Sequence, residues 1–380
     1  MSKNVDWTRV QAVGVRIKQV ASLSVFPTTK VRHPMAHRWA MVVFAFSMAV
    51  SVFPADVRPR AFGSSSAQPR SFSDPPLRIR AASMTPVAEL PALSTEDLAE
   101  LHRKNLASEY LTVGVVREMP TTLAVAPDRT AATTSFSWVG SVRVPTADRL
   151  RLRLTDLAIP RLATLWVYGA DGSAVGFDSS LAYNGTLWTP SVQGEQIWLE
   201  VSSPSEVRFN VSGIGDIRAL AQFAPSGTEC LRDLACENNQ ILRENATGVA
   251  LYGFVKDGNI GTCSGGLILD RKVTFEPYFL TANHCVSTSG QAATVEAFWD
   301  YRSSTCGAPP PPLSSLPHTT GASLLVTSST SDVTLLRLSS LPGTRWFLGW
   351  DPNPVPNGTK LYRISHPDAG KQQYSVTNLV

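Results

Sequence analysis

The stretch YFLTANHC, from Tyr278 to Cys285, runs an apolar strand directly into a histidine that is followed by a cysteine. Another cysteine, Cys263, opens the stretch CSGGLI and precedes Cys285 by 22 residues. A disulfide between Cys263 and Cys285 would clamp two neighbouring strands and add on the order of 3 kcal/mol in the loop-entropy model. It would also fix the backbone beside His284, and a general base needs its imidazole within hydrogen-bond reach of its nucleophile.

A second signal is SDVTLLRL, in which Asp332 leads an apolar strand that ends at Leu338. A carboxylate in this place can lie buried against an imidazole nitrogen, where it holds the tautomer and stabilises the imidazolium. No HExxH motif or CxxC pair occurs in the chain, and the two closely spaced histidines, His33 and His37, belong to the N-terminal leader, so the sequence does not favour a zinc site.

In order and spacing, the segments YFLTANHC, FWDYRSSTC, SDVTLLRL, FLGWD and YRISHPDAGKQQYS resemble the chymotrypsin-like serine proteases, and most closely their bacterial lysyl endopeptidase branch. The resemblance extends from about Cys230 to the C-terminus and implies a double β-barrel. It implies His284 as general base and Asp332 as its orienting partner. It also implies two disulfides, Cys263–Cys285 and Cys236–Cys306.

The nucleophile of that family is a serine in a Gly-x-Ser-Gly turn downstream of the aspartate, and no such turn follows Asp332. The branch pairs the equivalent of Cys230 with a cysteine beyond the nucleophile, which is also missing here. Both absences lead us to expect a sequence that is truncated within the second barrel and an inactive chain as given. Ser264 does not replace the nucleophile, because its neighbours Thr-Cys-Ser-Gly-Gly do not match Gly-x-Ser-x-Gly.

The basic charge of the chain is concentrated at its N-terminus. Residues 1–80 carry 12 Lys+Arg and 3 Asp+Glu, whereas the remaining 300 residues carry 22 and 27. This excess lies in a leader, so it does not indicate a nucleic-acid-binding surface. The apolar stretch 39–53 spans about 22 Å as a helix, which is short for a bilayer. With Met35, His37 and Arg38 before it, the stretch predicts a secretory signal over 35–55; a membrane anchor is the alternative.

The composition divides the chain into an upstream extension (1–34), the signal segment (35–55), a linker with a short helix (56–112), a β-sandwich (113–222) and a last segment (223–380); the resemblance implies that the sandwich is a propeptide and the last segment a partial protease domain. The helix is expected after Ser94-Thr-Glu-Asp, with an apolar face of Leu98, Leu101 and Leu106. The sandwich is expected from short strands between turns, one of which has an apolar face (Leu150, Leu152, Leu154) and a charged face (Arg149, Arg151, Arg153). The expected sandwich contains no cysteine and no catalytic motif, which indicates a structural or chaperoning role.

The sequence therefore predicts an all-β chain: an N-terminal β-sandwich propeptide and a chymotrypsin-like double β-barrel that is incomplete at its C-terminal end. By resemblance, it would be the precursor of a secreted or periplasmic serine endopeptidase that cleaves proteins or peptides after a basic residue. The alternative is a non-catalytic secreted binding protein. We expect a monomer without a cofactor, a metal, a nucleic-acid partner or a stable membrane association. Processing would fall between Arg218 and Cys230, where Arg218 is the basic residue.

Overall fold

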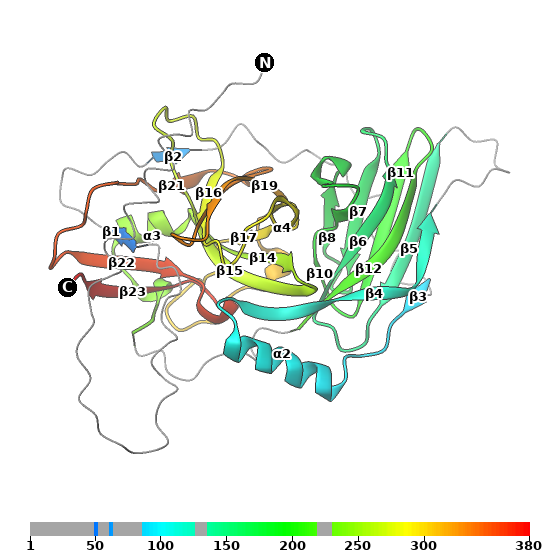
Figure 1. The fold of residues 1–380 in the computed structure, drawn as a ribbon, viewed down its shortest axis with the longest axis horizontal. Coiled ribbons are helices and arrows are strands. Elements are labelled where there is room, and N and C mark those ends of the chain that lie inside the picture. Colours follow the sequence, from blue (N-terminus) through cyan, green and yellow to red (C-terminus); the bar gives the residue numbers. More distant parts are fainter. Residues whose placement is uncertain (1–48, 52–60, 64–85, 126–134, 219–229) are drawn as a thin grey trace.

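The computed structural model describes residues 49–51, 61–63, 86–125, 135–218 and 230–380 (Figure 1). Strands make up 47% of this part and helices are few, which confirms the prediction of an all-β chain. We call residues 86–218 the N-terminal unit and residues 230–380 the C-terminal unit. The predicted upstream extension and most of the predicted signal segment lie outside the described residues. No helix in the part that is described is both long and apolar enough to cross a bilayer.

The N-terminal unit is a sandwich of two sheets with one apolar core between them. One sheet holds β10, β6, β12 and β4 in that order, with β9 beside β6; the other has the order β3-β5-β11-β7-β8. All of these pairings are antiparallel except β3 with β5. The bounds are β4 (Leu111–Val125), β6 (Arg149–Ala158), β9 (Leu187–Trp188), β10 (Val192–Gln193) and β12 (Arg208–Ile217), and β3 (Ala88–Glu89), β5 (Phe136–Arg143), β7 (Thr164–Gly169), β8 (Ala174–Phe177) and β11 (Gln196–Ser203).

The helix α2 (Thr95–Ala107) lies where the sequence predicts a short helix. Ser94 and Asp97 cap it reciprocally: the Ser94 hydroxyl accepts the Asp97 N–H at 3.1 Å, and the Asp97 carboxylate accepts the Ser94 N–H at 2.9 Å. Leu101 is buried, but Leu106 is 74% exposed, so the expectation that Leu106 belongs to the packed face is wrong.

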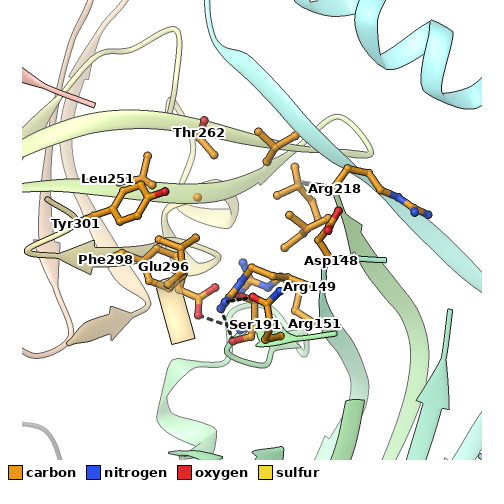
Figure 2. Close-up of a pocket in the computed structure, with 16 residues that line it drawn as sticks. Asp148, Arg149, Arg151, Ser191, Arg218, Leu251, Thr262, Glu296, Phe298 and Tyr301 are labelled. Atoms are coloured by element: carbon orange, nitrogen blue, oxygen red, sulfur yellow. Dashed lines mark hydrogen bonds between the residues drawn. The ribbon is translucent and has the colours of Figure 1, made fainter. Parts of the chain in front are cut away.

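The alternating strand β6 has two faces, as predicted. Leu150, Leu152 and Leu154 are buried in the core of the sandwich. On the opposite face, however, Arg149 and Arg151 are also buried, because the C-terminal unit covers that face. At Arg149 and Arg151, the charged face of this strand therefore lies between the two units and not in solvent (Figure 2).

The C-terminal unit packs its first strands around a second core that includes Trp299, Tyr252 and Phe279. Strand β15 pairs with β14 on one side and, at its end, with β16, and β16 pairs with β20. The bounds are β14 (Val249–Lys256), β15 (Asn259–Leu267), β16 (Tyr278–Thr281), β17 (Glu296–Trp299), β18 (His318–Thr320), β19 (Ala322–Ser328) and β20 (Val333–Leu338).

Strand β15 begins at Asn259, directly after a tight hairpin turn. In this turn Asp257 and Gly258, both with positive φ (50° and 74°), join β14 to β15. An Asp-Gly pair is the usual sequence of such a two-residue turn, because both positions need a left-handed backbone.

The remaining elements complete the C-terminal unit. A hairpin of β22 and β23 packs over a third, smaller core with β13 on its edge. Two short helices, α3 and α4, interrupt the strands. The bounds are β13 (Arg232–Asp233), α3 (Gln240–Ala246), α4 (Ser289–Ala293), β21 (Arg345–Phe347), β22 (Lys360–Ser365) and β23 (Gln373–Asn378), with β1 (Ala49–Ser51) beside β22 and β2 (Ala61–Gly63) beside β21.

Strand β4 connects the two units (Figure 1). From Gly114 to Val125 it pairs with β12 in the sandwich, and its first residues, Leu111 to Val115, pair with Asn259 to Thr262 of β15 on the other side. The two sheets thus continue into each other. Val113 and Ile260 are buried between the units together with Leu251. The predicted boundary near residue 113 therefore lies inside a strand that both units share.

Candidate active site

The pairing of β16 with β20 brings together two residues that are 48 positions apart. The strands are antiparallel, and Thr281 at the end of β16 lies opposite Thr334 near the start of β20. His284 follows β16 by three residues, and Asp332 directly precedes β20. His284 and Asp332 therefore lie at the same end of the sheet.

His284 and Asp332 contact each other through two hydrogen bonds. The Asp332 Oδ2 lies 2.7 Å from the His284 Nδ1, and the Asp332 Oδ1 accepts the His284 backbone N–H at 2.9 Å. Because an ionised carboxylate only accepts, the neutral ring carries its proton on Nδ1 and leaves a lone pair on Nε2. Asp332 has a left-handed backbone (φ 48°), a conformation that asparagine and aspartate tolerate better than most residues.

Two further side chains hold the backbone on either side of the imidazole. The buried Thr334 donates its hydroxyl to the carbonyl of Val286 at 2.7 Å, and Lys256 Nζ donates to the carbonyl of His284 at 2.8 Å. Sequence reasoning missed both residues. The alternation of β20 places Thr334 on an inward face, but no sequence signal connects Lys256 to this site.

A buried chain of hydroxyls anchors the end of β16. The Tyr252 phenol bonds to the Thr281 hydroxyl at 2.7 Å, and Thr281 Oγ1 donates to the carbonyl of Ser264 at 3.1 Å. Burial raises the pKa of the Tyr252 phenol well above its ordinary value, so this hydroxyl remains a neutral donor. These bonds tie β16, the strand that leads into the histidine, to both β14 and β15.

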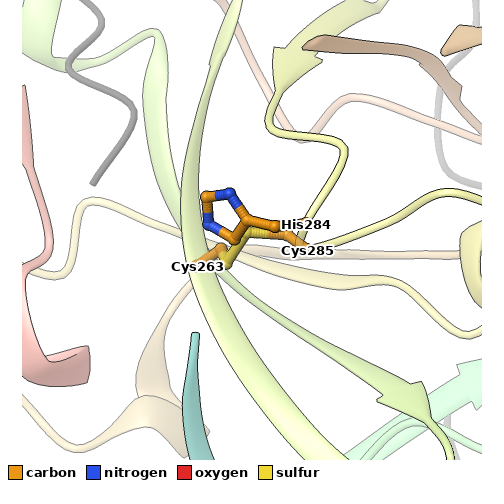
Figure 3. Close-up of side chains that lie close together, drawn as sticks. All are labelled: Cys263, His284 and Cys285. Atoms are coloured by element: carbon orange, nitrogen blue, oxygen red, sulfur yellow. A yellow bond between two sulfur atoms is a disulfide. The ribbon is translucent and has the colours of Figure 1, made fainter. Parts of the chain in front are cut away.

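The disulfide Cys263–Cys285 clamps the same two strands next to the imidazole (Figure 3). It joins the middle of β15 to the residue after His284, with 6.5 Å between the Cα atoms. The two sulfurs and a ring nitrogen of His284 lie within 4.8 Å of one another. Because both sulfurs are bonded to each other, neither is a thiolate that could bind a metal ion.

The other cysteines are arranged as the resemblance implies. Cys236 and Cys306 form a disulfide across 70 residues, and Cys230 is a free, exposed cysteine. Lys371 stabilises this region: its Nζ pairs with Asp233 Oδ2 at 2.6 Å and also bonds to Ser303 Oγ at 2.9 Å.

Ser264 and His366 contact each other rather than His284. The Ser264 hydroxyl accepts the backbone N–H of His366 at 2.8 Å. The His366 ring stacks on Tyr301 with 6.1 Å between centroids and donates from Nδ1 to the carbonyl of Gly370 at 3.1 Å. Burial lowers the pKa of His366 from its ordinary value to about 4. The ring is therefore neutral near pH 7. Among the described residues, no hydroxyl bonds to Nε2 of His284.

Comparisons with known proteins identify the family. The family model "Lysyl endopeptidase, C-terminal domain" matches residues 224–379, and the model "Lysyl endopeptidase N-terminal domain" matches residues 89–214. The lysyl endopeptidase of Pseudomonas aeruginosa is 28% identical in a 219-residue alignment that covers 52% of this chain and 47% of that protein. The match to this chain thus spans about half the length of that relative. Both domain models and this relative lead to one conclusion: the chain belongs to the lysyl endopeptidase family.

Proposed function

We propose that the chain carries the general base and the orienting carboxylate of a serine endopeptidase, His284 and Asp332. The observation that carries this proposal is the pair of hydrogen bonds from Asp332 to the ring and to the backbone of His284, at 2.7 and 2.9 Å. One carboxylate thereby sets both the tautomer and the position of the imidazole, and the lone pair of Nε2 remains to accept a proton.

In the proposed reaction, a serine hydroxyl attacks the carbonyl carbon of the scissile peptide while His284 Nε2 takes the hydroxyl proton. The imidazolium then returns this proton to the nitrogen of the leaving amine, and the peptide C–N bond breaks. Water repeats the cycle on the acyl-enzyme and releases the new carboxyl group. Asp332 remains ionised throughout and stabilises the positive ring by the 2.7 Å contact with Nδ1.

The nucleophilic serine, in this proposal, belongs to a segment that the 380 residues do not contain. Two observations support this: no Gly-x-Ser-Gly turn follows Asp332 in the sequence, and no described hydroxyl bonds to His284 Nε2. Family membership further supports cleavage after a basic residue and a secreted or periplasmic precursor whose N-terminal unit is a propeptide.

Proton NMR of the chain tests the imidazole–carboxylate pair without needing catalysis. We expect a far-downfield Nδ1 proton from His284 that disappears in Asp332→Asn, because an amide in place of the carboxylate no longer holds that proton. Asp156→Asn is the matched control, since Asp156 lies in the N-terminal unit and bonds to Asn210. A wild-type spectrum without this signal would contradict the proposed role of the pair.

Labelling with a fluorophosphonate tests where the nucleophile lies. We expect no labelled serine in the 380-residue chain. In the protein isolated from its source, we expect one labelled serine, and His284→Ala should abolish its labelling. Specific labelling of the 380-residue chain would disprove the placement of the nucleophile. An unlabelled source protein would disprove the peptidase and favour the non-catalytic binding protein.

A further inference from the structure

Two hydroxyl groups of the β19–β20 hairpin hold the chain on both sides of His284. On one side, the Asn283 side chain donates from Nδ2 to the Thr327 hydroxyl at 2.7 Å. On the other side, the Thr334 hydroxyl donates to the carbonyl of Val286 at 2.7 Å. The two hydroxyls contact each other at 2.6 Å. A continuous series of hydrogen bonds, which we call the 283–286 relay, therefore runs from Asn283 through the hairpin to Val286.

The direction of each hydrogen bond in the relay follows from its two ends. An amide NH₂ group only donates and a carbonyl oxygen only accepts, whereas each threonine hydroxyl carries a single proton. The three contacts of the relay need three protons, one from Asn283 and one from each threonine. Thr327 therefore donates to Thr334, and Thr334 donates to Val286. With the amide of Asn283 turned over, its oxygen would face Thr327 and one contact would have no proton.

The position of Thr327 depends on a bulge in β19. Leu324 lies opposite Leu336, but Val326 lies opposite Leu335, so the register against β20 shifts by one residue between them. As a result, Thr327 lies opposite Thr334. In the register before the shift, Val326 would take that place. Bulges next to functional sites commonly redirect a side chain, and this one places a hydroxyl where the regular register would place a valine.

The same hairpin carries the carboxylate that contacts the imidazole. Asp332 and Thr334 are two residues apart and point to the same side, where Asp332 contacts His284 and Thr334 contacts Val286. In contrast, Lys256 and the disulfide next to His284 tie this segment to β14 and β15. The relay therefore fixes the segment that carries the imidazole to the hairpin that carries its partner.

We propose that Asn283 and Thr327 are positioning residues of the peptidase, which keep the imidazole of His284 in contact with Asp332 through the relay. The inference rests on the proposed function, because the contact that it concerns is the proposed pair of general base and carboxylate. Loss of the Thr327 hydroxyl would take the acceptor from Asn283 and the donor from Thr334. The segment would then move away from Asp332 more often and expose the Nδ1 proton of His284 to water.

Exchange of this Nδ1 proton with water, measured by NMR on the 380-residue chain, reports how often the contact opens. Thr327→Val keeps the shape of the side chain and removes the hydroxyl. We expect it to speed the exchange about 10-fold, which is the effect of one lost hydrogen bond. Thr327→Ser, which keeps the hydroxyl, should exchange like wild type.

A second variant tests whether the relay acts as one unit. Asn283→Leu removes the first donor of the relay and should also speed the exchange. The double variant Asn283→Leu with Thr327→Val should exchange no faster than Thr327→Val alone, because both changes break the same series of bonds.

Two controls distinguish positioning from a general effect on stability. Thr377→Val removes an exposed hydroxyl from β23, and Ser94→Ala weakens the cap of α2 in the other unit. Neither residue belongs to the relay, so neither change should alter the exchange at His284.

Three results would overturn the proposal and leave the proposed function intact, provided that wild type shows the Nδ1 signal. The first is a wild-type exchange rate in Thr327→Val. The second is an exchange in Thr327→Ser as fast as in Thr327→Val, because the hydroxyl would then have no role. The third is an equal acceleration in Ser94→Ala, because the exchange would then follow global stability. A wild-type chain without the signal would contradict the proposed function itself, and with it the role of the relay.

Discussion

His366 should make the protein progressively less stable as the pH falls below about 6.5. Its ring is buried against Tyr301, its Nδ1–H donates to the Gly370 carbonyl, and its Nε2 has no hydrogen-bond partner among the described residues. A proton on Nε2 would create a buried donor without an acceptor. Burial accordingly lowers the pKa of His366 to about 4, whereas a histidine in the unfolded chain has a pKa of about 6.5.

The sign and size of the effect follow from proton linkage. Between these two pKa values the unfolded chain binds a proton at residue 366 and the native protein does not, so acidification favours unfolding. Above about pH 7 neither state is protonated there, and this contribution vanishes. From pH 7.5 to 4.5 the difference is about 2.5 kcal/mol.

His366→Asn isolates this contribution, because asparagine does not titrate and its side-chain NH₂ can still donate to Gly370. The free energy of unfolding of both proteins is measured in urea at pH 7.5, 6.5, 5.5 and 4.5, which covers most of the interval between the unfolded and the native pKa of His366. We expect wild type to lose about 2.5 kcal/mol more than the variant over this range. Equal losses in the two proteins, or an NMR titration of His366 near pH 6.5 in the folded state, would refute the reasoning.

Three further changes test other parts of the structure by the same urea unfolding. Cys263→Ala with Cys285→Ala opens a loop of 22 residues and should lower stability by about 3 kcal/mol; no loss would show that the bond does not constrain the unfolded chain. Gly265→Ala would place a methyl group 2.1 Å from the Phe279 ring, and we expect a loss of about 1–3 kcal/mol; a stability equal to wild type would mean that the core has room there. Ser94→Ala removes the hydroxyl that caps α2 and should cost about 1 kcal/mol, whereas Ser94→Asp, which restores an acceptor, should not.

The sequence predicted those features that depend on neighbouring residues. An apolar run that ends in a histidine and an aspartate that opens the next apolar run are local patterns, and the strands at 278–281 and 333–338 form as expected. The alternation of Leu150, Leu152 and Leu154 with arginines correctly indicates a strand with two different faces. The Ser94–Asp97 cap is likewise a local signal, because both hydrogen bonds form within one helical turn.

Only the tertiary structure decided which of these pieces meet. Antiparallel pairing of β16 with β20 sets His284 against Asp332, and its register depends on packing of the whole core rather than on either strand alone. The alternation of residues in β6 predicts that the strand has two different faces. It does not predict that the C-terminal unit covers Arg149 and Arg151 on one of them. The sequence likewise does not predict the burial of Arg218 and shows only a basic residue after which a protease could cleave. Its burial arises from segments far away along the chain, because its side chain bonds to Thr146 and its backbone N–H to Val113.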